Sequence, residues 1–116
     1  MKSFRLHFLY FVLLSLCVVQ ASAQSETVKN QLSSADGYFY GQKYADAKSI
    51  YLRHIQDLSP IHQYRLGICY YSEGAKDPQG YIDGMKWLLQ SAERGHTEAM
   101  NSIAYFYQIG FGVKKD

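Results

Sequence analysis

The sequence predicts an all-α protein, a right-handed α-α superhelix (solenoid) of about two and a half helical hairpins that follow a signal peptide. The first observation is a repeated phrase. Leu66-Gly67-Ile68-Cys69-Tyr70 returns as Ile103-Ala104-Tyr105-Phe106-Tyr107, and the two copies begin at positions 66 and 103, 37 residues apart. The second is the spacing of apolar residues, which is helical throughout the chain after the N-terminus. Together they favour binding over catalysis.

The N-terminal residues have the pattern of an export signal. Lys2 and Arg5 form a short basic segment, and residues 6–19 are a largely apolar run of 14 residues. Small residues follow in Ala21-Ser22-Ala23, where a signal peptidase cleaves. We therefore expect residues 1–23 to be a signal peptide and the mature protein, periplasmic or secreted, to begin at Gln24.

Two other interpretations of this segment are less favoured. A transmembrane span needs about 20 apolar residues, more than this run provides. A lipoprotein anchored through Cys17 needs a small residue immediately before the cysteine, and Leu16 is not small. We expect no membrane insertion after the signal is removed.

The mature charge excludes several partner classes. Removal of Lys2 and Arg5 lowers the Lys and Arg count from 12 to 10, equal to the 10 acidic residues. The net charge is then about zero, without the basic patch that nucleic acids require. The expected partner is a protein or an extended peptide.

Local signals place five helices in the mature chain. Ser59-Pro60 is a helix start, because serine caps a helix and proline suits its first position. Gly95 is expected to end the fourth helix, and Thr97 to cap the fifth. The expected ranges are 25–40, 44–58, 60–73, 81–94 and, between the Thr97 cap and Gly110, 98–109. They divide the mature chain into a hairpin over 24–59, a repeat over 60–96 and an incomplete repeat over 97–116.

The repeated phrase resembles a known family. Leu66-Gly67-x-x-Tyr70, Lys86-Trp87 and Ser91-Ala92-Glu93-Arg94-Gly95-His96 are similar to the consensus of Sel1-like repeats, which are related to tetratricopeptide repeats. The phrase begins again at Ile103. Residues 35–58 are more similar to a tetratricopeptide unit, and Gly84 departs from the family, which usually has alanine there.

The resemblance implies a binding groove. In such superhelices the first helix of each pair lines the concave face. Tyrosine suits this role, because it combines apolar area with a hydrogen-bonding tip. The alternative is that several of these tyrosines only pack between repeats. The implied groove residues are Asp36, Tyr40, Tyr64, Ile68, Tyr71, Asn101, Tyr105 and Gln108.

The fifth helix is expected to lack its second helix. Ile103, Phe106 and Phe111 would then form an open apolar flank, where a homodimer interface is expected. Three explanations stay open: a truncated gene product, a face covered by a second chain, or collapse of the tail onto the body.

No residues predict catalysis, a metal site or a cofactor. His54 and His62 are separated by the Ser59-Pro60 helix start and lack zinc-site spacing. Cys69 is the sole cysteine after position 23, and we expect it to be a small buried residue rather than a reactive thiol. The expected function is a non-enzymatic scaffold of the bacterial envelope. One alternative is a β-lactamase-like, penicillin-binding repeat protein; another is a repeat fragment that acts only within an assembly.

Overall fold

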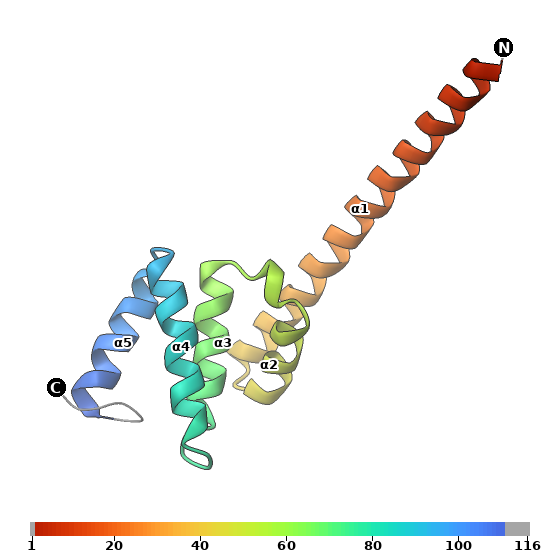
Figure 1. The fold of residues 1–116 in the computed structure, drawn as a ribbon. Helices are drawn as coiled ribbons and strands as arrows, with labels where there is room; N and C mark the ends of the chain where they lie inside the picture. The colour runs from red at the N-terminus through yellow and green to blue at the C-terminus, as the bar shows by residue number, and fades with distance from the viewer. Residues whose placement is uncertain (1, 111–116) are drawn as a thin grey trace. The chain divides into compact units, whose positions relative to one another are not determined.

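A computed structural model describes residues 2–110 of the 116-residue chain, and their side chains except those of residues 2 and 21–24. The all-α fold class is confirmed, since no strand occurs in the described residues. Five α-helices and one short 3-10 helix follow one another along the chain (Figure 1). They are α1 (Lys2–Tyr40), α2 (Tyr44–Arg53), η1 (Ile55–Asp57), α3 (Pro60–Ser72), α4 (Gln79–Glu93) and α5 (Thr97–Ile109).

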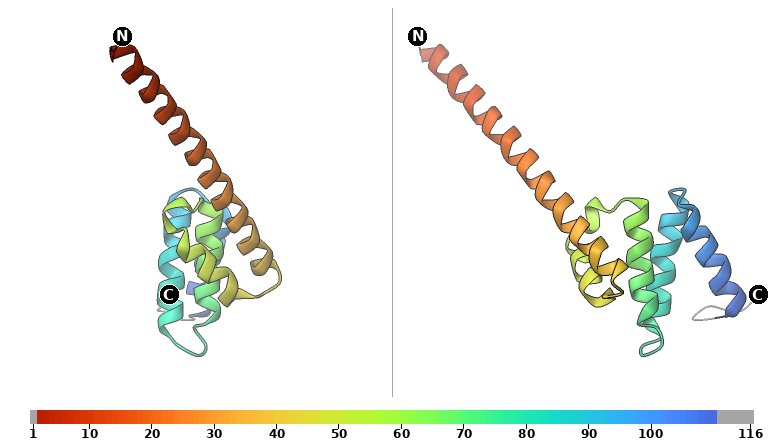
Figure 2. Two further views of the ribbon diagram at one scale, coloured as in Figure 1. Left: turned by 90° about the vertical axis from the view of Figure 1, so that its right-hand side faces the viewer. Right: turned by 180° about the vertical axis from the view of Figure 1, so that it is seen from behind.

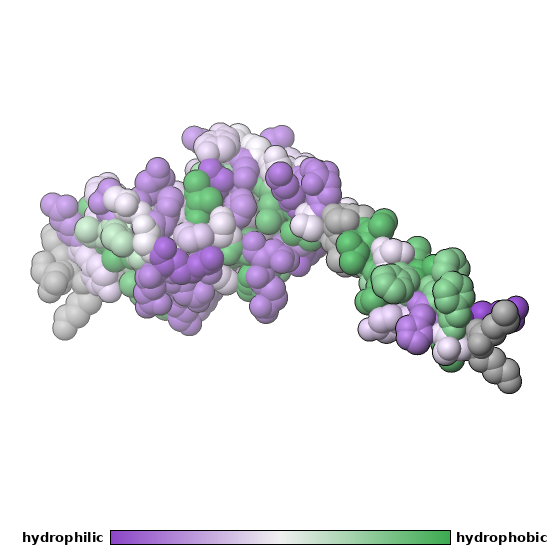
Figure 3. Space-filling model, turned by 90° about the horizontal axis from the view of Figure 1, so that it is seen from above, coloured by the Kyte–Doolittle hydropathy of each residue, from purple (hydrophilic) through white to green (hydrophobic). Residues whose placement is uncertain are grey.

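The chain divides into two units between Gln31 and Leu32. In the first unit, the part of α1 that covers residues 3–20 carries many exposed apolar side chains, which are green on the face that Figure 3 shows. Phe4 and Phe11 are 77% and 71% exposed. The helix is long and apolar enough to cross a membrane, a property that N-terminal signal sequences share. We expected the first helix to start at Ser25, but α1 already begins at Lys2, because no glycine or proline interrupts the chain before Gly37.

The second unit, from Leu32 onward, contains the core. There α2 packs on α3, α3 on α4 and α4 on α5, in the order of the sequence (Figure 2). Each helix gives small or apolar side chains to a common interior. The buried apolar residues are Leu32, Ala35, Ala47, Tyr51, Leu58, Leu66, Cys69, Tyr71, Met85, Leu88 and Ala99.

The backbones of α3 and α4 approach each other closely. A β-carbon placed on Gly67 would lie 3.0 Å from the Gly84 carbonyl oxygen. A β-carbon on Gly84 would lie 2.7 Å from the Gly67 carbonyl oxygen and 2.9 Å from the Tyr71 backbone nitrogen. Gly67 and Gly84 therefore allow α3 and α4 to pack closely. Ala104, the counterpart of Gly67 in the repeated phrase, is exposed on α5.

The predicted helix boundaries are partly right. Ser59 caps α3, since its side chain accepts a bond from the His62 backbone N–H and Pro60 is the first helical residue. Gly95 has a φ of 92°, which glycine adopts without strain. The second helix was predicted to reach Leu58 but ends at Arg53. Leu58 is extended there because the chain must lead into the Ser59 cap.

The start of the fifth helix was predicted wrongly. Thr97 is the first residue of α5, and His96 occupies the capping position without a side-chain cap bond. The end of α5 fits the prediction more closely, since Gly110 follows with a φ of 76° in the left-handed region.

Candidate functional site

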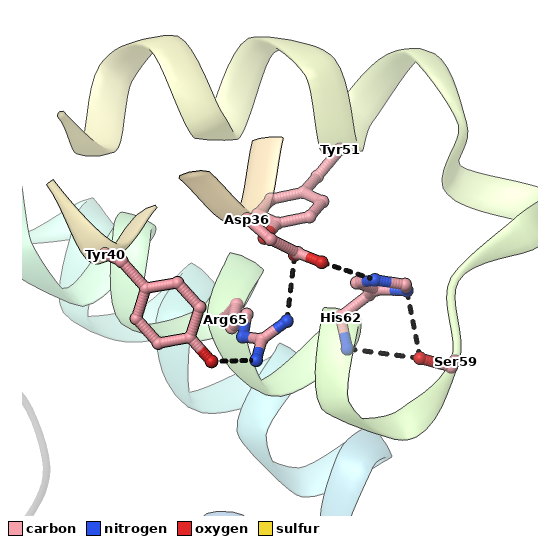
Figure 4. Close-up of polar contacts among 6 residues, drawn as sticks. All are labelled: Asp36, Tyr40, Tyr51, Ser59, His62 and Arg65. Carbon is pink, nitrogen blue, oxygen red and sulfur yellow. Dashed lines mark hydrogen bonds and ion pairs between the residues drawn. The ribbon is translucent and has the colours of Figure 1, made fainter. Parts of the chain in front are cut away.

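Asp36, on the C-terminal part of α1, lies at the centre of a polar cluster that joins three helices (Figure 4). Its Oδ1 accepts from Arg65 Nη1 of α3 at 2.9 Å and from the Tyr51 hydroxyl of α2 at 2.5 Å. Its Oδ2 lies 3.3 Å from His62 Nε2 of α3. One carboxylate therefore holds α1, α2 and α3 together through three side chains.

His62 extends the cluster to the start of α3. Its Nδ1 lies 2.9 Å from Ser59 Oγ, which also accepts the His62 backbone N–H at 3.4 Å. A carboxylate can only accept, so in the neutral imidazole Nε2 carries the proton toward Asp36. Nδ1 then accepts the Ser59 hydroxyl proton, and every polar atom of the imidazole ring is satisfied.

The order Ser59, His62, Asp36 is that of the nucleophile, base and carboxylate in a serine hydrolase. Here the surrounding charges oppose that chemistry. The Arg65 guanidinium and the Tyr51 hydroxyl share Asp36 Oδ1, and the arginine charge offsets the carboxylate that would stabilise an imidazolium. We therefore assign the cluster to the connection of the helices.

Arg65 is buried, 8% exposed, and its charge is paired with the Asp36 carboxylate. Burial lowers the pKa of its guanidinium, but the adjacent Asp36 carboxylate outweighs this, and the pKa is raised above its ordinary value. Burial and the bond to Asp36 likewise raise the pKa of Tyr51. Both groups keep their ordinary protonation over the physiological range.

Arg65 also holds Tyr40, the last residue of α1. Its Nη2 donates to the Tyr40 hydroxyl at 2.5 Å, and the guanidinium carbon lies 4.9 Å from the centre of the Tyr40 ring. The Phe39 ring lies 5.8 Å from the same carbon. Tyr40 is nevertheless 71% exposed, so an outward-facing aromatic ring is fixed from beneath by a buried cation.

The remaining predicted groove residues lie on α3 and α5. Tyr64 is half-buried, with its ring centre 5.1 Å from that of His96, and Ile68 is half-buried. Tyr105 is 56% exposed. Asn101 and Gln108, one turn to either side of it on the same helix, are also exposed.

Tyr71 lies differently from the other predicted groove residues. It is 8% exposed and stacks on Phe106 of α5, with ring centres 3.7 Å apart and planes 11° from parallel. Burial raises the pKa of Tyr71 to about 12. This is the packing role that the sequence left open for some tyrosines, and Tyr71 links α3 to α5.

Two of the three residues predicted for a dimer interface are partly covered within the chain. Phe106 packs on Tyr71 within the chain, Ile103 is half-buried, and Phe111 lies outside the described residues.

Cys69 is fully buried, and burial raises its thiol pKa to about 12, as for an unreactive core cysteine.

Sequence reasoning missed Arg65, His62 and Tyr51 as members of one cluster. The sequence did contain a signal for Arg65, because this residue directly precedes the apolar phrase that begins at Leu66. A charged residue beside a core position needs a partner, and Asp36, on the preceding first helix, is that partner. Tyr51 is completely buried, so its hydroxyl also needed a partner in the interior.

Comparison of the chain with protein-family models, with curated proteins and with solved structures found no match. Among the described residues, no group of three or more His, Cys, Asp or Glu side chains is placed to hold a metal ion.

Proposed function

We propose that the chain is a non-enzymatic scaffold that binds an extended peptide or a partner protein along its first helices. In this proposal residues 32–110 are helical hairpins of the Sel1-like and tetratricopeptide-like kind, arranged as a solenoid. Two contacts between successive first helices support the arrangement. Asp36 of α1 pairs with Arg65 of α3, and Tyr71 of α3 stacks on Phe106 of α5. Helices that follow one another in the chain also pack together, α2 on α3, α3 on α4 and α4 on α5.

The exposed tyrosines of the first helices carry the proposal. Tyr40 of α1 and Tyr105 of α5 are 71% and 56% exposed, so both rings are accessible to a partner. Asn101 and Gln108 flank Tyr105 with exposed amides. Aromatic anchors surrounded by uncharged hydrogen-bonding groups are typical of protein-binding surfaces.

The N-terminal unit supports export. The exposed apolar side chains within residues 3–20, together with the basic Arg5, fit a signal sequence. On this proposal the mature protein acts in the bacterial periplasm or outside the cell. A measured mass that lacks residues 1–23 would support removal of this segment.

A paired set of variants tests the binding surface. Protein is purified from cells that express the full chain, and linear peptides are selected on it from a random display library. We expect Tyr64→Ala with Tyr105→Ala to weaken the selected peptides about tenfold or more, the loss typical of aromatic anchors. The matched control is Tyr38→Ala with Tyr107→Ala, since these tyrosines are 40% and 39% exposed and are not predicted groove residues.

The outcome is read only from folded variants, shown by helical circular dichroism and a cooperative melt. Unchanged affinity in the folded Tyr64→Ala, Tyr105→Ala protein would contradict the assignment of the surface. So would an equal loss in the control pair.

A further inference from the structure

We propose that a second copy of this chain covers one side of α5, and that the two α5 helices pack on each other in antiparallel orientation. This side, the outer flank of α5, consists of Met100, Ile103, Ala104 and Tyr107. The four residues have the spacing i, i+3, i+4 and i+7, which places them on one face of a helix. The peptide-binding surface proposed on the first helices is not needed for this pairing.

The outer flank is apolar and largely uncovered. Met100 and Tyr107 are 46% and 39% exposed, Ala104 is exposed and Ile103 is half-buried. The buried side of α5 is a different one, which carries the fully buried Ala99. Adjoining apolar side chains in water favour a partner that removes them from solvent.

The repeated phrase indicates what kind of element covers this flank. Ile103 and Ala104 correspond to Leu66 and Gly67, which stand 37 residues earlier on α3. There the same flank is packed on a helix, α4. Leu66 is fully buried, and a β-carbon on Gly67 would lie 3.0 Å from the Gly84 carbonyl oxygen. The flank of α5 therefore has the pattern of a surface on which a helix packs, and small Ala104 allows that helix to approach.

The order of residues along the flank fits a second copy of α5. In a two-fold pair, residue i of one copy meets residue j of the other, and j meets i. The midpoint of the flank lies between Ile103 and Ala104. An antiparallel pair about this point sets Met100 opposite Tyr107 of the second copy, and Ile103 opposite Ala104 of the second copy. The methionine thioether packs favourably on an aromatic ring, and the small alanine leaves room for the isoleucine.

The charges of α5 also favour the antiparallel pair. Glu98 is the one residue of the helix with a formal charge, and it lies on nearly the opposite side from Met100, since two residues turn a helix by about 200°. A symmetric pair therefore brings no like charges together at the flank. The antiparallel orientation also places the positive end of each helix dipole beside the negative end of the other. Because each copy contributes a single helix of 13 residues, we expect a weak dimer.

The oligomeric state is measured by sedimentation velocity on protein purified from cells that express the full chain, from about 1 µM to about 1 mM. We expect a monomer–dimer equilibrium within this range. The melting temperature should rise with protein concentration, because association stabilises the folded state. A protein that is monomeric throughout, or that grows into assemblies larger than a dimer, would overturn the proposal.

A charge on the flank tests where the two copies meet. Ala104→Glu places two like charges beside the two-fold axis, so it should weaken the dimer about tenfold or more. Ala104 is exposed, and the variant should therefore keep the helical circular dichroism and the melting temperature of the dilute wild type. Tyr105→Glu is the matched control. It adds the same charge at an exposed position about 100° further round the helix, and it should dimerise as the wild type does.

Mixing two folded variants tests the symmetry of the pair. Ala104→Glu and Ala104→Lys should each be monomeric at a concentration where the wild type is dimeric. Their equimolar mixture should dimerise again, because opposite charges then meet near the axis. No recovery on mixing, or an equal loss in Tyr105→Glu, would contradict the antiparallel pairing. A dimer that Ala104→Glu leaves unchanged would contradict it too, and would indicate association through the apolar N-terminal helix instead.

Discussion

Replacing Gly84 by alanine should destabilise the protein although alanine is the better helix former. The new β-carbon would lie 2.7 Å from the Gly67 carbonyl oxygen, 2.9 Å from the Tyr71 nitrogen and 3.0 Å from the Tyr71 β-carbon. Two of these atoms belong to the backbone of α3 and cannot rotate away. Overpacking of this kind costs about 1–3 kcal/mol, and we expect the upper end here. The higher helix propensity of alanine returns about 1 kcal/mol.

The net loss is about 2 kcal/mol, which lowers the melting temperature of a domain of this size by about 8–16 °C. Gly37→Ala is the matched control. It is the same substitution in α1, and a β-carbon there would meet nothing within 4 Å. It should stabilise the protein by about 0.5–1 kcal/mol. Thermal melts and urea titrations followed by far-UV circular dichroism measure both. A Gly84→Ala protein as stable as the wild type would show that α3 and α4 do not approach this closely.

Two further predictions concern the cap and the buried thiol. Ser59→Ala removes the cap of α3 and the partner of His62, so it should cost about 1 kcal/mol in a urea titration. Ser49→Ala, which loses only an exposed bond to a backbone carbonyl within α2, should change stability by less than half as much. Stability should also fall as the pH rises from about 9 to about 12. The folded state raises the pKa of Cys69 from 9.0 to about 12, so the unfolded chain loses this proton first. Cys69→Ala should flatten that fall by up to about 1.4 kcal/mol per pH unit, and an equal slope in both proteins would contradict the burial of the thiol.

Features that depend on local signals could be predicted from the sequence. Ser59-Pro60 begins α3 because both residues act on the first turn alone. Gly95 follows α4 because few other residues adopt its backbone conformation without strain. A local signal also gave one wrong prediction, that of Thr97 as the cap of α5. Thr97 has a side chain that can cap a helix, but the turn after Gly95 leaves His96 in the capping position.

The cluster around Asp36 could be predicted only in part. The resemblance placed Asp36 and Tyr40 on one helix face, but nothing local indicates that Arg65 and Tyr51 converge on one carboxylate oxygen. That convergence depends on the way α1, α2 and α3 cross, which is set by packing over 15 and 29 positions of sequence (36 to 51 and 36 to 65). The reason for glycine at position 84 also depends on packing between helices. In the sequence, Gly84 only departs from the consensus that the repeat resembles. In the structure, the absence of a side chain is required because Gly67 of α3 lies opposite it.

The thin attachment of α5 has a consequence for the kinetics of the molecule. Of the described residues of α5, Ala99 is the one that is fully buried, and the stack of Phe106 on Tyr71 is its main aromatic contact with α3. α3, in contrast, buries six residues, among them Leu66 and Cys69. The backbone amides of α5 should therefore exchange with solvent through local opening, well before the whole domain unfolds. Tyr105 lies on this helix. A ligand bound at Tyr105 would bind only the closed form of α5 and would therefore make its opening rarer. Binding would then slow amide exchange along the whole helix, including at amides far from the ligand itself.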